Sequence, residues 1–151
     1  MHIALSPPEN AAALTRIAFA AKRSWGYPQE WIERWRPVLT VTPDYIRANM
    51  TFSATEGDEI FGFCALRLNG TDAWVDHLWV SPESAGKGIG RALFFCCEQT
   101  AGEHGAVVLR IESDPNAEGF YHAMGAVTVG RVPAPMDGSE RFLPLLEKTL
   151  G

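Results

Sequence analysis

A glycine-rich segment between a predicted strand and a predicted helix holds the residues best suited to do chemistry. Its glycines and basic residues are Gly86, Gly88, Gly90, Lys87 and Arg91. Glycines let the backbone turn tightly and approach a ligand closely. The free amides and the dipole at the start of a helix attract phosphate groups, and the two basic side chains would add positive charge. The segment therefore predicts a cradle for a phosphate or a pyrophosphate.

Two other kinds of phosphate-binding loop do not match this segment. A P-loop needs Ser or Thr after its Gly-Lys pair, but Gly88 follows Gly86-Lys87, and no glycine stands at the first position of the pattern. This mismatch disfavours phosphotransfer. A dinucleotide fingerprint needs G-x-G-x-x-G, whereas the glycines here have G-x-G-x-G spacing. Taken alone, the segment could also be a tight loop that binds nothing.

A second motif follows in the segment from Asp114 to Ala126. It contains an Asn, a Phe-Tyr pair and a glycine, namely Asn116, Phe120, Tyr121 and Gly125. With the strand end 78–82 and the glycine-rich loop, this motif resembles the acyl-CoA motifs of the GNAT superfamily of N-acetyltransferases. The spacing of one helix plus one strand fits, and residues 60–63 resemble the preceding strand. The resemblance covers roughly residues 60–132. Two motifs in order at this spacing argue strongly against a loop that binds nothing.

The resemblance implies acetyl-CoA as the acyl donor, CoA as the product and no metal. Backbone groups of Leu78 and Val80 would hold the pantetheine arm, as an added strand would. The Leu78 amide could also polarise the thioester carbonyl, as an oxyanion donor does. The residues implied to hold the pyrophosphate are Gly86, Lys87, Gly88, Ile89, Gly90 and Arg91.

Ala85 departs from the family pattern, which usually has Arg or Gln at this position. Backbone amides grip the pyrophosphate for the most part, and Ala supplies its amide as well as Arg does. The change could weaken the affinity for the cofactor, and Lys87 or Arg91 could compensate.

Two residues of the second motif gain roles from the resemblance. Asn116 would contact the cofactor arm, or it could instead cap the helix beside Pro115. Tyr121 matches the usual general acid of the family. A phenol has a pKa of about 10, and the thiol formed from the leaving thiolate has a pKa of about 8.5. The phenol can therefore protonate the thiolate only if the site assists, for example through a hydrogen bond. The alternative is that Tyr121 packs as a buried aromatic beside Phe120.

The base that removes a proton from the attacking amine stays open at this point. Asp76 and His77 lie on the strand before the loop, and strand alternation predicts that their side chains point to opposite faces. Only one of them could then face the acceptor, and a water chain or solvent could replace both. His2, His104 and His122 have no metal-ligand spacing, which argues against a zinc site.

The acceptor would meet the early helices, where four aromatic residues gather: Trp25, Tyr27, Trp31 and Trp35. Aromatic faces could hold an ammonium group by cation–π contact. Packing of these helices onto the sheet is the alternative, and it suits Trp31 and Trp35 best because they are spaced i and i+4. Trp25 and Tyr27, on either side of Gly26, are the better candidates for a substrate pocket.

Hydrophobic periodicity places these residues on alternating strands and helices. Strands are predicted over residues 3–5, 51–55, 60–68, 73–80, 107–111, 127–132 and 141–146. Helices are predicted from about residue 9 to 25, over 29–36 with an end at Pro37, over 42–48, from the loop to 104, and over 115–124. We therefore expect an α/β fold of the α+β type. The resemblance implies a GNAT-like mixed, mostly antiparallel sheet of about six to seven strands flanked by helices.

Length and composition agree with one domain over residues 1–151, with acceptor-side helices in 1–50 and an acyl-CoA-binding core in 60–132. The net charge of −5 argues against a large nucleic-acid surface. No membrane-length apolar run and no signal peptide is visible. The odd number of cysteines does not form a disulfide framework, so we expect a reduced, cytoplasmic protein.

Transfer of an acetyl group from acetyl-CoA to a primary amine is the activity that the resemblance implies. The partner would be a small-molecule amine or a peptide amine, with no nucleic acid and no membrane, and a homodimer stays open. The alternative is a catalytically silent acyl-CoA-binding sensor or structural module on the same fold. Tyr121 favours the enzyme, and the missing consensus base favours the sensor.

Overall fold

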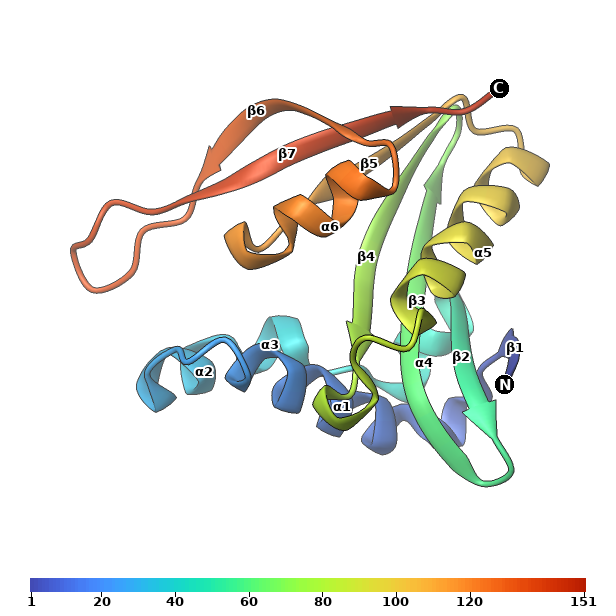
Figure 1. Ribbon diagram of the computed structural model, residues 1–151, viewed down its shortest axis with the longest axis horizontal. Coiled ribbons are helices and arrows are strands. Elements are labelled where there is room, and N and C mark those ends of the chain that lie inside the picture. The colour runs from blue at the N-terminus through green and yellow to red at the C-terminus, as the bar shows by residue number, and fades with distance from the viewer.

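The computed structural model describes all residues, 1–151, and its core is a twisted sheet of seven strands (Figure 1). The strands are β1 (His2–Leu5), β2 (Met50–Glu56), β3 (Glu59–Asn69), β4 (Asp72–Val80), β5 (Val108–Glu112), β6 (Val127–Pro133) and β7 (Phe142–Thr149). The helices are α1 (Ala11–Arg23), α2 (Gln29–Arg34), α3 (Arg36–Leu39), α4 (Pro43–Ala48), α5 (Ile89–Glu103) and α6 (Glu118–Ala123). None of these helices has the length and apolar character needed to span a membrane.

The strands follow the order β1-β2-β3-β4-β5-β7-β6 across the sheet. Every neighbouring pair is antiparallel except β4 and β5, which are parallel. The parallel pair requires the crossover helix α5, because parallel strands cannot be joined by a tight turn. The prediction of a mixed, mostly antiparallel sheet flanked by helices is confirmed.

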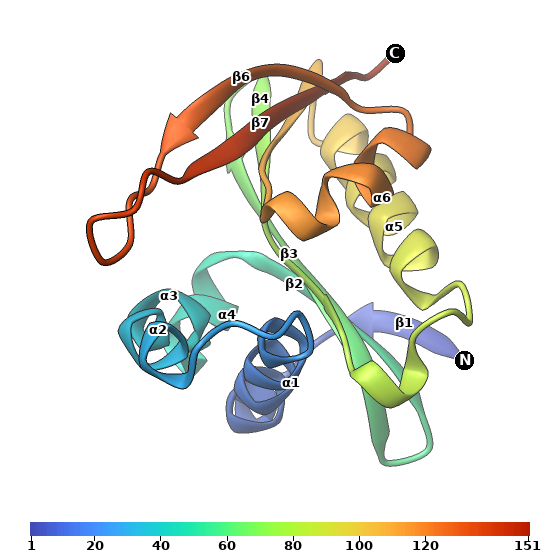
Figure 2. The ribbon, with the colours of Figure 1, turned by 60° about the vertical axis from the view of Figure 1, so that its left-hand side comes forward.

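The sheet separates two apolar cores (Figure 2). Helices α5 and α6 cover one face, where Leu93, Phe94 and Tyr121 are buried against the strands. Helices α1 to α4 cover the other face, where Leu14 and Phe63 are fully buried. Alternation along β4 sends successive side chains to these two cores, which fixes the side of the sheet that each site residue can reach.

Strands β4 and β5 separate soon after they pair (Figure 1). Their ladder joins only Asp72–Trp74 with Val108–Arg110, although β4 continues to Val80. The β5-facing edge of β4 beyond Trp74 therefore has no strand partner. The glycine-rich loop follows directly at the end of this open edge.

The helix boundaries differ from the sequence prediction at Pro37. We expected this proline to end the helix that begins at Gln29, but that helix ends at Arg34 and a new turn, α3, starts at Arg36. Pro37 stands in the first turn of α3, where its missing amide would have had no helical partner. Proline here starts a helix instead of closing one.

Candidate active site

The loop after β4 is shaped by left-handed glycines. Gly86 has φ +79° and Gly88 has φ +81°, a region that side chains with a Cβ rarely adopt. A Cβ built on either glycine would meet no atom within 4 Å, so the backbone angle and not crowding favours glycine at both positions. Gly88 is the residue that precedes α5, and no side chain caps the helix there. The loop therefore turns through its glycines as the sequence suggested, and its role as a phosphate cradle stays a prediction.

The amides of this loop are free. No amide from Gly86 to Arg91 donates to a carbonyl of the loop, and the first to bond back is that of Ala92, to the Gly88 carbonyl at 3.1 Å. Free amides at a helix start, reinforced by the helix dipole, form a binding site for anions. Lys87 and Arg91 are exposed beside them and pair with no carboxylate.

Gly90 has a packing role. A Cβ at this position would stand 3.3 Å from Cε1 of Phe120, which is tighter than ordinary contact. The missing side chain thus lets the second motif pack directly onto the start of α5, next to Val80. The two motifs found in the sequence meet at this point.

Leu78 and Val80 project toward the core under α5, while His77 and Trp79 face the opposite layer. Leu78 is paired with Cys64 of β3, and Val80 with Gly62. Their second edge faces the gap toward β5, where the backbone groups of β4 have no strand partner. These residues can therefore accept a ligand that adds to β4 as a short strand.

Strand alternation predicted that the side chains of Asp76 and His77 point to opposite faces of the sheet. This prediction is wrong. The ladder between β3 and β4 pairs Ala65 with His77 and Leu66 with Val75, so Asp76 is an extra residue in a β-bulge. Both side chains consequently reach Tyr45. The Tyr45 hydroxyl donates to Asp76 Oδ2 at 2.9 Å, and the rings of Tyr45 and His77 pack edge to face, 5.5 Å apart.

The ring of His77 is committed to a neighbour. The indole Nε1 of Trp79 donates to His77 Nδ1 at 3.1 Å. An indole N–H can only donate, so Nδ1 is the acceptor and the neutral ring carries its hydrogen on Nε2. Burial lowers the pKa of His77, which keeps the ring neutral. In this arrangement the lone pair of His77 is not available to an amine.

Tyr121 lies under α5 among Phe94, Phe120 and the thiols of Cys64 and Cys97. Burial raises the pKa of Tyr121 well above its ordinary value, so the phenol keeps its proton. Its hydroxyl makes no hydrogen bond within the protein. Every side-chain nitrogen or oxygen that is shielded from solvent does have a hydrogen-bond partner. The small exposed part of Tyr121 therefore includes its hydroxyl. Cys64 is paired with Leu78 of β4, and both side chains lie in the same core as Tyr121.

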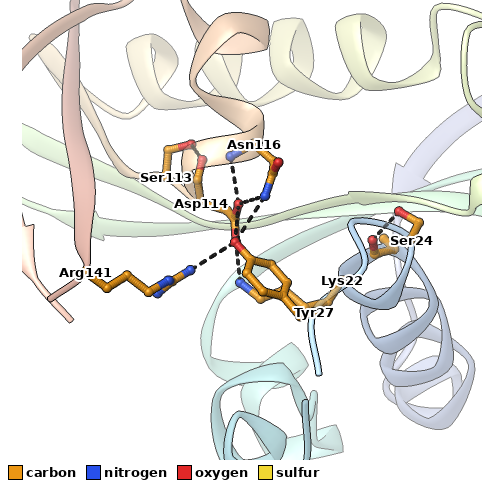
Figure 3. Close-up of polar contacts among 8 residues, drawn as sticks. Lys22, Ser24, Tyr27, Ser113, Asp114, Asn116 and Arg141 are labelled. Carbon is orange, nitrogen blue, oxygen red and sulfur yellow. Dashed lines mark hydrogen bonds and ion pairs between the residues drawn. The ribbon is translucent and has the colours of Figure 1, made fainter. Parts of the chain in front are cut away.

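A buried polar cluster joins the two layers of the molecule at Asp114 (Figure 3). Lys22 Nζ lies 2.7 Å from Asp114 Oδ2, the Tyr27 hydroxyl donates to it at 3.0 Å, and Arg141 Nη2 lies 3.4 Å away. Burial alone would raise the pKa of Asp114, but Lys22 and the amide of Asn116 bring it below its ordinary value. Burial lowers the pKa of Lys22, and Asp114 partly offsets that effect.

The sequence analysis missed Lys22, Asp114 and Arg141. One signal could have found Lys22, because it continues the apolar stripe of α1 formed by Leu14 and Ala18 at spacings of i+4. A lysine at such a position needs a buried partner. Nothing local marks Arg141, which reaches the cluster only because the segment before β7 folds back onto α2. There Trp31 Nε1 donates to Asp137 at 2.6 Å, and Arg34 pairs with the same carboxylate.

Asn116 belongs to this cluster. Its side-chain amide donates to the Tyr27 hydroxyl at 3.1 Å and to Asp114 Oδ1 at 2.9 Å. The turn before α6 is capped by Asp114, whose carboxylate accepts from the Asn116 backbone amide at 2.8 Å. The contact between Asn116 and the cofactor arm stays a prediction.

Three of the four early aromatic residues surround a cation of the chain itself, and the fourth, Trp31, packs on Tyr27 and Trp35. Lys22 Nζ stands 4.2 Å from the ring centroid of Trp35, 5.2 Å from that of Tyr27 and 5.9 Å from that of Trp25. Trp25 also packs against Trp79 of β4 at 5.9 Å. Lys22 thus occupies the cation–π site that was expected to hold a substrate ammonium. Trp25 and Tyr27 belong to the helical layer that packs against β4.

The seven-stranded sheet, its separating central strands and its glycine loop define an acetyltransferase domain. Residues 27–139 match the acetyltransferase (GNAT) domain, and the chain belongs to this family.

Solved structures share the fold over nearly the whole chain. A GCN5-related N-acetyltransferase from Rhodopseudomonas palustris is 26% identical, with a TM-score of 0.81 over 99% of this chain and 95% of that one. The PaiA N-acetyltransferase from Thermoplasma acidophilum, solved with coenzyme A, is 21% identical, with a TM-score of 0.74 over 98% of both chains. YncA from Salmonella typhimurium, solved with acetyl-CoA, is 18% identical, with a TM-score of 0.71 over 100% and 94%.

Proposed function

We propose that this chain transfers an acetyl group from acetyl-CoA to a primary amine. The observation that carries the proposal is the row of free amides from Gly86 to Arg91 next to the open edge of β4. A pyrophosphate accepts hydrogen bonds from such amides, and a pantetheine arm, with its own amides, can pair with a strand edge. The CoA and acetyl-CoA bound in two structural relatives support this reading.

Acetyl-CoA would supply an acetyl group already activated as a thioester. The loop residues from Gly86 to Arg91 would bind the pyrophosphate, and the backbone of Leu78 and Val80 would hold the arm. A backbone amide near Leu78 would stabilise the negative charge that develops on the carbonyl oxygen. These roles need only backbone groups, so Ala85 in place of a basic residue is compatible with them.

Tyr121 would act as the general acid. Its raised pKa keeps the proton on the phenol, and its hydroxyl has no competing partner within the protein. A weak acid delivers a proton well when strong negative charge develops on a thiolate close to it. Tyr121 would give up its proton to the sulfur as the carbon–sulfur bond breaks.

Asp76 is the better supported of the two candidate bases. It lines a cavity of about 330 Å³ at the start of the gap between β4 and β5, with Glu112 on the opposite strand. His77 offers no free lone pair, because its Nδ1 accepts from Trp79. Asp76 would take the amine proton directly or through a water molecule.

A transfer assay separates this function from a catalytically silent acyl-CoA-binding module. The protein is incubated with acetyl-CoA and a panel of primary amines, with free thiol and the mass of the product as readouts. We expect amine-dependent thiol release and an N-acetylated product. Binding of acetyl-CoA without amine-dependent release for any acceptor would favour the sensor.

A further inference from the structure

Two charged groups of opposite sign flank the gap between β4 and β5. On one side, Lys22 and Arg141 converge on the single carboxylate of Asp114, which leaves one positive charge in excess. On the other side, Asp76 and Glu112 line the cavity at the start of the gap with Arg67 as their only cation there, which leaves one negative charge in excess. The side chains of Lys22, Arg141 and Asp76 are largely shielded from solvent, where a charge is costly without a partner, whereas Glu112 is exposed.

The positive group has donors to spare. Arg141 donates only through Nη2, at 3.2 Å to the Tyr27 hydroxyl and at 3.4 Å to Asp114. Its Nε and Nη1 make no hydrogen bond. Every side-chain nitrogen or oxygen that is shielded from solvent has a hydrogen-bond partner. These two donors therefore reach solvent, although only 12% of the side chain is exposed. A guanidinium offers such donors in a fork that matches a carboxylate.

The negative group is also incompletely paired. Asp76 is paired with Arg67 at 3.2 Å and accepts from the Tyr45 hydroxyl, but the side chain of Glu112 makes no ion pair or hydrogen bond within the chain. Glu112 ends β5, and Asp114 follows it two residues later in extended backbone. Their Cα atoms are thus about 7 Å apart, since a strand rises about 3.3 Å per residue. A small ligand can span the two groups.

Both groups lie beyond the point where β4 and β5 separate, in the direction of Leu78. The last paired residues of the separating strands are Trp74 and Arg110. Leu78 stands three strand positions beyond Trp74, because the bulge at Asp76 adds one residue to β4, and Asp114 stands four residues beyond Arg110. Trp25 contacts Lys22 on one side and Trp79 on the other, and Trp79 is the residue after Leu78 in β4.

We propose that the acceptor is a zwitterion of the amino-acid class, with its carboxylate bound by Lys22 and Arg141 and its amine facing Asp76 and Glu112. The proposal rests on the proposed function, and it names the class of acceptor for the same site. Two opposite charges a few bonds apart complement the two groups that flank the gap. The short link between Glu112 and Asp114 favours a small amino acid over a long peptide.

Matched acceptors test this charge preference in the wild-type protein. Each amino acid of a panel is compared with its carboxamide and with the corresponding amine that lacks the carboxylate, in the presence of acetyl-CoA. We expect kcat/KM to be about 10- to 100-fold higher for the amino acid, as is typical when charged hydrogen bonds are present. Equal kcat/KM for the three forms, or a preference for the uncharged ones, would overturn the proposal.

Arg141→Gln locates the preference. This variant should lose about 10- to 100-fold in kcat/KM for the amino acid while its kcat/KM for the matched carboxamide changes little. Arg47→Gln is the matched control, because Arg47 is exposed and pairs only with Asp44 on α4. An equal loss for both acceptors would show that Arg141 merely supports the fold and would overturn the assignment.

A binding measurement separates the two proposals. Calorimetry with the CoA-bound wild-type protein records the affinity for an amino acid and for its carboxamide without any need for turnover. Preferential binding of the amino acid without acetyl transfer would contradict the proposed function and leave the zwitterion site supported. Acetyl transfer with equal binding of both forms would do the opposite.

Discussion

Tyr121 combines burial with a hydroxyl that has no partner in the protein. If it protonates the leaving thiolate, Tyr121→Phe removes one oxygen and leaves the ring packed against Phe94 and Phe120. We expect kcat and kcat/KM to fall together by roughly a hundredfold or more, while the affinity for CoA stays unchanged.

The steady-state comparison has an internal control. A thioester with a more acidic leaving thiol needs less help from an acid, so its turnover should be less sensitive to Tyr121→Phe. If the Phe variant acetylates amines as fast as wild type, Tyr121 only packs, and water or another group must deliver the proton.

Asp114 should contribute strongly to stability, because it is the only carboxylate between two partly buried cations. Asp114→Asn leaves Lys22 and Arg141 without a counter-ion, and we expect the free energy of unfolding to fall by about 2–4 kcal/mol. Asp44→Asn, which breaks an exposed pair with Arg47, should change it by no more than about 0.5 kcal/mol. Denaturant unfolding of both variants measures the difference.

The pH dependence of this effect has a defined sign. The pKa of Asp114 in the folded protein lies below its ordinary value, so its contribution is complete above the unfolded pKa of about 3.9. It is lost as the pH falls through the lower folded pKa. The gap between wild type and Asp114→Asn should therefore narrow below about pH 4. A gap that is constant with pH would mean that the charge of Asp114 is not what stabilises the fold.

At the level of single residues, local sequence patterns point to candidates in the loop and in the second motif, and their roles stay predictions. The loop glycines and Tyr121 stand in short motifs whose spacing is visible in the chain. Lys22, Asp114 and Arg141 are far apart in sequence and meet only through tertiary packing, so no local spacing could reveal them. Asp76 and His77 were wrongly predicted to point to opposite faces of the sheet. A bulge adds one residue to the strand, and simple alternation of side chains does not anticipate a bulge.

Among the elements, the join between β4 and α5 has the most specific chemistry. Its amides from Gly86 to Arg91 make no hydrogen bond within the chain, and Gly86 and Gly88 adopt left-handed conformations there. The helix bounds of this region were predictable from glycine and from periodicity. The early separation of β4 from β5 was not, because no local pattern in either strand marks the residue at which their ladder ends.

Gly88→Asp tests this join. Aspartate tolerates a left-handed backbone better than most residues, and a Cβ here meets no atom within 4 Å, so the fold should survive. Its carboxylate would repel the pyrophosphate, and we expect the affinity for CoA to fall more than about tenfold, since like charges in contact cost several kcal/mol.

Gly88→Asn is the matched control, because it has the same shape and backbone preference without the charge. Calorimetry with CoA should show a much smaller loss for Asn than for Asp. Equal affinities of wild type and Gly88→Asp would show that the pyrophosphate binds elsewhere. Ala85→Arg should leave the affinity for CoA unchanged or raise it, and markedly weaker binding would mean that this loop differs from those of the family.

On the scale of the whole molecule, two cores meet along a sheet that is incomplete in its centre. The layer of α1 to α4 and the layer of α5 and α6 lie on opposite faces of the sheet (Figure 2). The Asp114 cluster connects Lys22 of α1 with the segment before α6 and with Arg141. A ligand seated between β4 and β5 would add contacts to both halves. Binding of CoA should accordingly stabilise the entire fold, and thermal unfolding reports that directly.

The most direct measurement is the thermal midpoint of the wild-type protein with CoA, with ATP and with a dinucleotide in parallel. A ligand that binds only the folded state stabilises it by about 2.7 kcal/mol at roughly a hundred times its dissociation constant. We predict a clear rise of the midpoint with CoA or acetyl-CoA. No shift with CoA beside a clear shift with ATP or a dinucleotide would contradict the account.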